Sequence, residues 1–539
     1  MKKAFLAIAL LALSLAAPAQ TKGFKLGKWT EIQSAILKEL NRSYVDSLPV
    51  DRIERAAVDA MLAELDPYTV YIPEEENEDL RMMINKTYGG IGAIIYKPDI
   101  QGNVIINEPY QGSPAVKAGL RAGDEILTID GQTVAGLTSQ QCSEKMRGVP
   151  GTKVAFTVKK ARTGEIKNVT ITRQTIHLPD VEYYGFLRPG VGYILQSGFT
   201  EGVGEEIRSA IKDMRKSSKL DTLVLDLRGN GGGLMSEAID IVSIFVPQGS
   251  LVVTAKGRAE GSSYEYRTNK APLDTKLPLV LLVDSSSASS SEIVAGALQD
   301  MDRAIIVGTR TFGKGLVQSI RPLPYNGELK ITTAKYYTPS GRCVQAIDYS
   351  NRAEDGSVGH IPDSLTHEFK TAKGRTVRDG GGITPDIIVK AHDYSRLTYS
   401  LVVNGVVEQY ALEYVRAHES IPAATAFGLT DEEYEQFVAF AEGKDFDYRS
   451  SARTYFDYVK KELERDGLTE AMAPELEALG KALDMEKAEF LRLKKDEIMP
   501  FIEEEIVVRY YFSPAGVAVR LRYDEQLHEG LRKASSFSL

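Results

Sequence analysis

The stretch of the chain that most constrains its fold runs from residue 283 to residue 318 and reads VDSSSASSSEIVAGALQDMDRAIIVGTRTFGKGLVQ. An apolar run that begins at Leu277 ends in its six serines, and a second apolar run, Ala304 to Val307, ends in a glycine-rich loop. Two short buried strands with a helix between them predict a βαβ unit. Because such units place their functional groups at the carboxyl ends of the strands, Ser289 and Lys314 are the reactive side chains expected there.

A second glycine-rich loop follows another predicted strand. The apolar segment Thr222–Leu227 leads into Arg228-Gly229-Asn230-Gly231-Gly232-Gly233, and an amphipathic helix follows. Glycines between a strand and a helix N-terminus leave backbone N–H groups available to an anion, and in catalysis such a loop serves as an oxyanion hole. A plain tight turn is the alternative, but it would explain one of these glycines and hardly four.

Ser289 lies three residues before Glu292, which is the spacing of a capping box at a helix N-terminus. This structural role is compatible with catalysis, because a serine there also faces the positive end of the helix dipole. A serine nucleophile needs a base. None of the six histidines lies near the serine cluster in the sequence, but a Ser-His-Asp arrangement assembles in space and stays open as an alternative.

Lys314 is the candidate base nearest in the sequence, flanked by Gly313 and Gly315 within apolar residues. An unperturbed lysine, with a pKa of about 10.4, is neutral only about once in 2,500 molecules at pH 7, so a base role requires a pocket that lowers this pKa. Gln318 follows four residues later, and in an extended segment its amide oxygen would lie on the same side as the Lys314 amine. A solvated surface charge is the alternative for such a lysine.

Three segments between residues 86 and 175 have the order and spacing of a PDZ domain, which they resemble closely. They are Tyr88–Ala93 (YGGIGA), Gly112–Leu120 (GSPAVKAGL) and Gly123–Gly131 (GDEILTIDG). In that family the glycine loop presents backbone N–H groups to the terminal carboxylate of a peptide, which adds as an extra strand. Gly90 and Gly92 would allow positive φ and close approach of the anion. The resemblance therefore implies carboxylate binding by Gly90, Ile91, Gly92 and Ala93, with a ligand-free turn as the alternative.

Residues from about 30 to 390 resemble a C-terminal processing (tail-specific) protease of the S41 class of serine endopeptidases. The match includes the PDZ segment and further motifs in the family's order: Leu65–Thr69 (LDPYT), Asp226–Gly233 (DLRGNGGG), Ser287–Gly296, Thr311–Gln318, Tyr337–Arg342 (YTPSGR) and Gly382–Asp386 (GITPD).

This resemblance implies roles for individual residues. The family's nucleophile is the middle serine of a Ser-Ala-Ser-Ala-Ser-Glu run, which selects Ser289, with Ser290 in place of the usual alanine. Lys314 would be the general base and Gln318 its orienting partner. The oxyanion hole would use the Ser290 amide and the amide of Gly232 or Gly233. No metal and no cofactor are implied.

Residues 1–19 have the pattern of a secretory signal peptide. Lys2 and Lys3 precede the apolar run Ala4–Leu13, and Ala17-Pro18-Ala19 is a small-x-small cleavage site. The apolar run is too short to span a membrane as a helix, and no other stretch is long and apolar enough. We therefore expect an exported protein, in the periplasm, with no integral membrane segment after cleavage. The net charge of −9 argues against a nucleic-acid partner.

The chain is thus predicted to be a multidomain α/β protein. After the signal peptide we expect a helical N-terminal domain (28–85), a β-barrel-like PDZ domain (86–175), an α/β protease core with βαβ units (183–393) and a helical C-terminal domain (395–539). Residues 350–382 are expected to form a surface insertion in the core. The two cysteines, Cys142 and Cys343, lie in different predicted domains and are expected to be free and buried.

The helical tail is expected to carry no catalytic group. One helix face is predicted to gather apolar residues: Leu476, Leu479, Leu483, Phe490 and Leu493. Such a stripe needs a partner surface, which would be the protease core, a second copy of the chain, an adaptor, or the other tail helices.

The sequence as a whole predicts a serine endopeptidase with a Ser-Lys mechanism. Its PDZ domain would recognise protein or peptide substrates by their free, apolar C-termini. A catalytically silent PDZ-based binding scaffold is the alternative, and the presence of Ser289, Lys314 and Gln318 argues against it.

Overall fold

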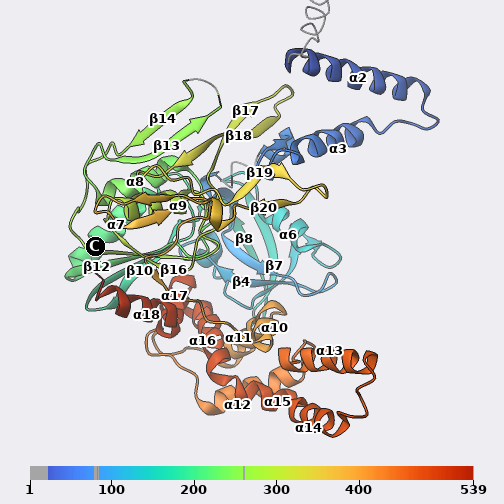
Figure 1. The fold of residues 1–539 in the computed structure, drawn as a ribbon. Helices are drawn as coiled ribbons and strands as arrows, with labels where there is room; N and C mark the ends of the chain where they lie inside the picture. Colours follow the sequence, from blue (N-terminus) through green and yellow to red (C-terminus); the bar gives the residue numbers. More distant parts are fainter. Residues whose placement is uncertain (1–21, 78–81, 83, 259–260, 538–539) are drawn as a thin grey trace, which may run out of the picture. The chain divides into compact units, whose positions relative to one another are not determined.

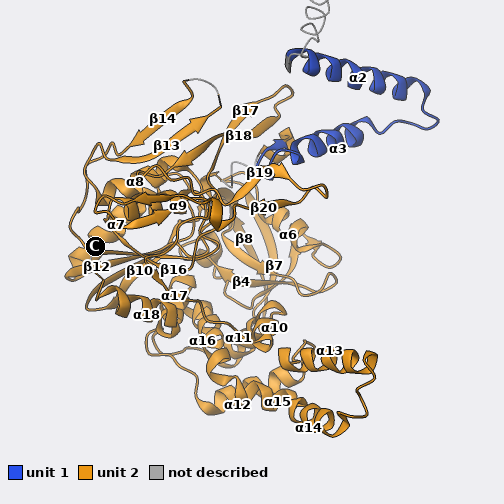
Figure 2. Cartoon of the chain, in the orientation of Figure 1, with its two compact units in different colours: residues 1–71 blue, residues 72–539 orange. Residues whose placement is uncertain are grey.

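The computed structural model describes residues 22–77, 82, 84–258 and 261–537 (Figure 1). The chain forms two compact units, residues 1–71 and residues 72–539 (Figure 2). The predicted signal peptide, residues 1–19, lies outside the described residues. Within the part of the chain that is described, no helix is both long enough and apolar enough to cross a membrane.

The described residues of the first unit form the helices α2 (Lys22–Ser43) and α3 (Val50–Ala63), and the strand β1 (Val70–Ile72) begins at the end of the unit. The helix α3 ends at Ala63, just before Asp66-Pro67. Asp66 Oδ1 accepts hydrogen bonds from the amides of Tyr68 and Thr69, both at 2.9 Å. A carboxylate that binds the backbone two and three residues ahead stabilises a turn in place of a further helical turn.

Residues 87–177 form an open β-sheet with two short helices. The paired strands, in spatial order, are β3 (Ala93–Tyr96), β4 (Val104–Pro109), β5 (Glu125–Ile129), β7 (Lys153–Lys159) and β8 (Ile166–Thr172). The strand β6 (Gln132–Thr133) pairs with β5, β2 (Thr87–Gly90) pairs with β9 (Gln174–His177), and the helices are α5 (Pro114–Lys117) and α6 (Ser139–Met146). The expected barrel-like form is wrong, because β3 and β8 are the two edges of an open sheet in the described part of the chain.

The central sheet of residues 181–388 also has six strands. Their spatial order is β10 (Val181–Arg188), β11 (Gly190–Gln196), β12 (Leu220–Asp226), β15 (Leu279–Val283), β16 (Ile305–Gly308) and β23 (Ile387–Ile388). All neighbouring strands are parallel except β10 and β11. The predicted βαβ unit is confirmed, since β15 and β16 pair in parallel and α9 (Ser290–Asp300) connects them.

Helices cover both faces of this sheet (Figure 1). On one face, α7 (Val203–Ser217), α8 (Met235–Phe245) and α9 share a core with Leu223 and Leu225 of β12. On the other face, α17 (Ser513–Tyr523) and α18 (Glu525–Ala534) pack against Val224 of the same strand. Because strand residues alternate between faces, the last two helices of the tail form the second layer of the core.

A second sheet flanks the first. In it β18 (Glu328–Tyr337) pairs with β13 (Leu251–Gly257) and β17 (Leu316–Pro322), and β13 pairs with β14 (Ser263–Arg267). The predicted insertion, 350–382, contains parts of two small hairpins, β19 (Ile347–Arg352) with β20 (Val358–His360) and β21 (Glu368–Lys370) with β22 (Thr376–Arg378). The remaining short elements are the 3-10 helices η1 (Glu74–Glu76) and η2 (Asp363–Leu365).

The rest of the tail is a helical bundle with a core of its own. Its helices are α10 (Arg396–Val403), α11 (Val406–Ala417), α12 (Asp431–Glu442), α13 (Ser451–Arg465), α14 (Ala473–Leu483), α15 (Lys487–Leu493) and α16 (Lys495–Tyr511). The single apolar stripe predicted from Leu476 to Leu493 is wrong, because its residues divide between α14 and α15. Phe490 is buried, whereas Leu479 and Leu493 are 51% and 65% exposed. The tail therefore buries apolar residues partly within itself and partly against the core.

The helix α17 also contacts the PDZ sheet at its N-terminus. Glu108, near the end of β4, accepts hydrogen bonds from the amide of Ser513 at 2.8 Å and from its hydroxyl at 2.5 Å. Beside it, Asn107 Oδ1 accepts a hydrogen bond from Arg509 at 2.7 Å. Two neighbouring residues of β4 thus bind the end of α16 and the start of α17.

Both cysteines are free, as expected. Cys142 is buried in the PDZ core, whereas Cys343 is only partly buried. Burial raises the pKa of each thiol, so neither side chain has the thiolate character of a reactive cysteine.

Candidate active site

Three loops follow neighbouring strands at the same edge of the sheet that runs from β10 to β23. The glycine loop, residues 228–233, follows β12, the serine cluster follows β15, and the segment with Lys314 follows β16. These three strands are adjacent and parallel, so their carboxyl ends and the loops that follow lie together. The structure thereby places Ser289 and Lys314 at one edge of the sheet.

Ser289 occupies the turn between β15 and α9. Its φ of +56° is a conformation that costs a non-glycine residue about 1–3 kcal/mol and persists only where the surroundings impose it. The next two hydroxyls are buried and engaged, since Ser290 Oγ donates to Gly233 O at 2.9 Å and Ser291 Oγ donates to Asn230 O at 2.8 Å. Ser289 is partly exposed, and this exposure favours it over Ser291 as the nucleophile. The sequence alone did not show this difference.

The glycine loop packs directly against Ser289. Gly232 has a φ of +93°, and a Cβ there would lie 2.9 Å from both Ser289 Cβ and Ser290 N, so a larger residue would be strained. The amide of Gly232 already donates to Asn230 Oδ1 at 2.9 Å. Among the described residues, no hydrogen bond uses the amide of Ser290 or that of Gly233. Of the two glycines considered for the oxyanion hole, Gly233 is therefore the better candidate.

Glu292 joins the serine loop to the lysine loop. Its carboxylate accepts hydrogen bonds from the amide of Ser289 at 2.9 Å and from the amide of Lys314 at 2.8 Å. The amide of Gly313, at 2.7 Å, and the hydroxyl of Thr311, at 2.6 Å, complete its partners. Burial raises the pKa of Glu292 from its ordinary value of 4.5 to about 7, although these hydrogen bonds act in the opposite direction.

Tyr336 joins the same two loops through their carbonyl groups. Its hydroxyl lies 3.1 Å from the carbonyl oxygen of Ser289 and 2.6 Å from that of Lys314, within donating distance of both. The ring is 1% exposed, and β18 carries it beside the start of β17, just after Lys314. The amides of Ser289 and Lys314 thus both bind the Glu292 carboxylate. Their carbonyl groups both lie within hydrogen-bond distance of the Tyr336 hydroxyl.

Gln318 lies in β17, where its amide nitrogen donates to Thr332 Oγ1 of β18 at 3.1 Å. Lys314 precedes the start of that strand, so the strand spacing that suggested an i, i+4 pair does not cover both residues. The role of Gln318 as the partner of Lys314 stays a prediction.

The contacts of the histidines do not support a Ser-His-Asp arrangement at Ser289. Five of the six have polar or ring contacts with residues outside the three loops: His177 with Glu206, His367 with Asp379, His392 with Glu525, His418 with Tyr414, and His528 with the carbonyl of Arg522.

The predicted carboxylate loop of the PDZ domain lies between β2 and β3 and borders a cavity of about 220 Å³. Ile91, Gly92, Ala93 and Ile94 line this cavity. Gly92 has the expected positive φ, +73°, but Gly90 does not. A Cβ at Gly90 would instead lie 2.8 Å from the ring of Tyr88, so this glycine is required by close packing.

Sequence reasoning missed a cation at this cavity. Arg147, directly after α6, lines it, and its guanidinium lies 5.2 Å from the ring centre of Tyr88. It also missed Tyr336, and it recognised Glu292 only as a helix-capping residue. The spacing of Glu292 from Ser289 could have indicated its role, because the two residues are close in the sequence. Arg147 and Tyr336 reach their sites only through contacts between distant parts of the chain.

A strained serine at a strand–helix junction, beside unpaired loop amides and tied to a lysine loop, defines an α/β protein with a serine-hydrolase type of site. Three family models match the chain: Peptidase family S41 over residues 190–351, a PDZ domain over 105–160, and "Probable PDZ-protease, C-terminal helical domain" over 397–533.

Two relatives each match more than half of the chain. A carboxy-terminal-processing protease of Bartonella bacilliformis is 37% identical over 316 residues, which are 58% of this chain and 71% of the relative. A probable CtpA-like serine protease of Staphylococcus aureus is 33% identical over 310 residues, 57% of this chain and 61% of the relative. Among solved structures, the photosystem II D1 C-terminal processing protease is 27% identical, with a TM-score of 0.35 over 65% of this chain and 86% of that one. The chain belongs to the carboxy-terminal-processing proteases, serine peptidases of family S41.

Proposed function

We propose that this chain is an exported endopeptidase that uses Ser289 as nucleophile and Lys314 as general base. The observation that carries this proposal is the double link between the two residues, through the Glu292 carboxylate and the Tyr336 hydroxyl. Two buried side chains that fix the backbone of both residues pre-organise them, as a catalytic pair requires.

In the reaction, Ser289 Oγ attacks the carbonyl carbon of the scissile peptide bond while neutral Lys314 takes the hydroxyl proton. The amides of Ser290 and Gly233 bind the oxyanion of the tetrahedral intermediate. The protonated Lys314 then gives its proton to the leaving amine, which yields an acyl-enzyme on Ser289. Water attacks this ester while Lys314 takes one of its protons. Lys314 then gives that proton to Ser289 Oγ as the bond between Oγ and the acyl carbon breaks, so the carboxylic acid product leaves and the free enzyme is restored. Gln318 is proposed to orient the Lys314 amine.

Substrates are proposed to be proteins or peptides whose free C-terminus binds the PDZ domain. The amides of Gly90–Ala93 would receive the terminal carboxylate, and the Arg147 guanidinium at the rim of the cavity would add a positive charge. Ile91 and Ile94 in the cavity lining favour an apolar terminal side chain. The peptide backbone would extend along β3, which is an edge strand of the sheet.

Labelling with a serine-reactive phosphonate tests the chemistry. We expect one modified residue, Ser289, and no labelling or turnover in Ser289→Ala. Ser286→Ala is the matched control, because Ser286 is an exposed serine of the same cluster and should not affect the rate. A folded protein that binds C-terminal peptides but is never labelled would be the catalytically silent scaffold.

Export and assembly are tested separately. N-terminal sequencing of the protein from the periplasmic fraction should begin just after residue 19 if the signal peptide is removed there. Size in solution, with and without candidate adaptor proteins, tests whether the exposed apolar residues of the tail, such as Leu479 and Leu493, bind a second copy or another protein.

A further inference from the structure

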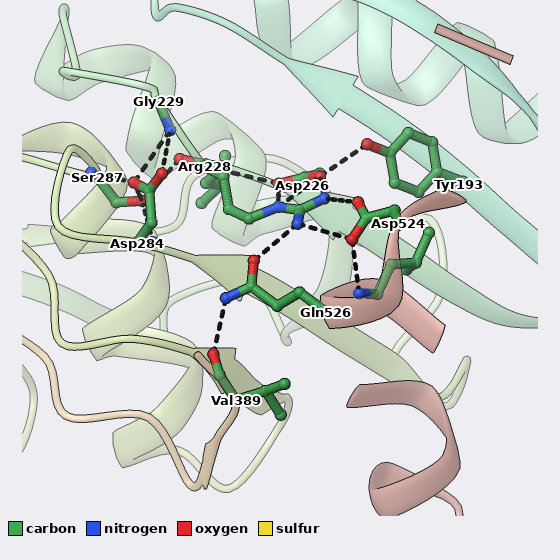
Figure 3. A network of polar contacts seen from close by, with 11 residues as sticks. Tyr193, Asp226, Arg228, Gly229, Asp284, Ser287, Val389, Asp524 and Gln526 are labelled. Atoms are coloured by element: carbon green, nitrogen blue, oxygen red, sulfur yellow. Dashed lines mark hydrogen bonds and ion pairs between the residues drawn. The ribbon is translucent and has the colours of Figure 1, made fainter. Parts of the chain in front are cut away.

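Arg228 is the point at which the C-terminal tail touches the glycine loop (Figure 3). It is the first residue of that loop, and its guanidinium reaches the start of α18. Its Nη1 and Nη2 lie 3.2 and 2.5 Å from the two carboxylate oxygens of Asp524, and Nη1 also donates to Gln526 Oε1 at 2.8 Å. These partners are about three hundred residues away in the sequence, at separations of 296 and 298.

The contact is a mostly buried ion network. The side chain of Arg228 is 18% exposed, and those of Asp226 and Asp524 on either side are 2% and 13% exposed. Burial opposes the charge of Arg228, but the two carboxylates outweigh it and raise the pKa of the guanidinium. Charge-assisted hydrogen bonds in such surroundings are directional and fix a side chain far better than an exposed ion pair does.

Arg228 in turn fixes the segment that leads to the candidate oxyanion amides. Its own amide donates to Asp226 Oδ1 at 2.9 Å. The next amide, that of Gly229, donates to the carboxylate of Asp284 at 3.1 and 3.2 Å, and Asp284 also accepts from the amide of Ser287 at 3.0 Å. The amides of Arg228 and Gly229, five and four residues before Gly233, are therefore bonded to β12 and to the serine loop. The amide of Ser287, three residues before Ser290, binds the same Asp284 carboxylate as Gly229.

We propose that Asp524 and Gln526 are positioning residues for the oxyanion loop and that they act through Arg228. The proposal rests on the proposed function, because it assigns the loop a role in binding the oxyanion. The last two helices of the tail are then required for the rate of the reaction, although they supply no reacting group. Gln526 is itself held, since its amide nitrogen donates to Val389 O at 2.7 Å, next to β23.

The variant Asp524→Asn separates this role from simple support of the helix. Asp524 also caps α18 by accepting a hydrogen bond from Leu527 N at 2.8 Å, and asparagine is an equally good N-cap. The substitution therefore keeps the cap and removes the charge that faces Arg228. Glu525→Gln is the matched control, because Glu525 is the adjacent acidic residue, is 82% exposed and faces His392 at 3.6 Å.

We expect Asp524→Asn to lower kcat and the rate of phosphonate labelling about ten-fold or more with KM for a short peptide little changed, since small displacements in a site cost one to two powers of ten. Hydrogen exchange of the amides of residues 229–233 should become faster. Glu525→Gln should match the natural protein in all three measurements.

Unchanged labelling and unchanged exchange in a folded Asp524→Asn protein would overturn the proposal, and so would a lower Tm with the full rate per folded molecule. If that variant does not fold, Gln526→Leu decides by the same criteria, because it removes one acceptor of Arg228 and keeps the ion pair. If the natural protein is never labelled at Ser289, the proposed function fails, while the exchange measurement still shows whether the tail holds the loop.

Discussion

The backbone amides of Ser289 and Lys314 donate to the same atom, Oε2 of Glu292, at 2.9 and 2.8 Å. The two residues are twenty-five positions apart in the chain, and this shared acceptor sets their relative position. A single buried carboxylate thus governs the geometry of the proposed nucleophile and base, and its protonation state should be visible in the behaviour of the protein.

The first prediction concerns pH and stability. The folded protein keeps a proton on Glu292 up to about pH 7, whereas the unfolded chain releases it near 4.5. The folded state therefore binds more protons between these values, so this contribution to the free energy of unfolding is complete below pH 4.5 and is lost as the pH rises through about 7. Its size is on the order of 3 kcal/mol. The measurement is the free energy of unfolding in urea from pH 4.5 to 8, with Ser289→Ala as the background to prevent self-cleavage. We expect this free energy to fall with rising pH in Ser289→Ala and to lack that slope in the double variant that also carries Glu292→Gln. Equal slopes in the two proteins would contradict the assignment.

The second prediction concerns the Tyr336 hydroxyl. Tyr336→Phe leaves two carbonyl groups at the site without this donor, which should cost about 1–3 kcal/mol of stability and lower kcat. The control is Tyr434→Phe in the tail, because Tyr434 is equally buried and its hydroxyl donates to the carbonyl of Leu491 at 2.8 Å. We expect a similar loss of stability and full activity per folded molecule in the control. If both variants kept full activity, Tyr336 would be only a structural residue.

The third prediction tests Lys314 as a base. Lys314→Arg keeps a positive charge that cannot be lost near neutral pH, so it should be as damaging as Lys314→Ala, with kcat about 10²–10⁴-fold lower in each. The rate of the natural protein should rise with pH as Lys314 loses its proton. Substantial activity in the arginine variant would mean that Lys314 is a structural cation.

The fourth prediction uses two neighbouring glycines. Gly232→Ala places a Cβ 2.6 Å from Ala288 O at a positive φ, so it should destabilise the protein by more than about 2 kcal/mol and abolish most activity. Gly231→Ala is the control, because among the described residues a Cβ there meets no heavy atom within 4 Å. Thermal unfolding and peptide cleavage measure both variants, and equal behaviour of the two would refute the packing of the loop against Ser289.

The fifth prediction concerns recognition of the C-terminus. An amidated peptide should be cleaved much more slowly than its free-acid twin. Arg147→Gln should raise KM for the free acid about ten-fold and leave the amidated peptide unaffected, because only the former carries the charge. Lys145→Gln, whose amine donates to Gln132 at the surface, is the control. Equal cleavage of the two peptides by the natural protein would give the PDZ domain another purpose.

The parts of the fold that follow from local patterns could be predicted. The apolar runs before Ser289 and Lys314 are the parallel strands β15 and β16, and the spacing of Ser289 and Glu292 is used in a hydrogen bond at the start of α9. Glycine was less informative, because Gly90 serves close packing and only Gly92 serves a positive φ. Glycine in a sequence indicates that a side chain is excluded and leaves the reason open.

Contacts between distant parts of the chain could not be predicted. Asp524 and Arg228 have no pattern that links them, and the apolar residues of α17 and α18 resemble those of any amphipathic helix. The sequence therefore suggested only that the tail carries no catalytic group. With α17 and α18 covering one face of the central sheet, removal of residues 395–539 would uncover the core, so point variants are the better test.

The hydrogen bonds between Glu108 and Ser513 attach the N-terminus of α17 to the PDZ domain. The helix has eleven residues, about 16 Å at 1.5 Å per residue, and it is bonded at its first residue to the PDZ strand β4. The residue after its last turn is Asp524, the partner of Arg228. A short helix therefore connects the PDZ domain, which is proposed to bind the substrate's C-terminus, with the glycine loop, which is proposed to bind the oxyanion. The PDZ domain therefore cannot move as a rigid body unless the hydrogen bonds at Ser513 break or α17 moves with it. A movement of α17 would in turn displace Asp524, the partner of Arg228.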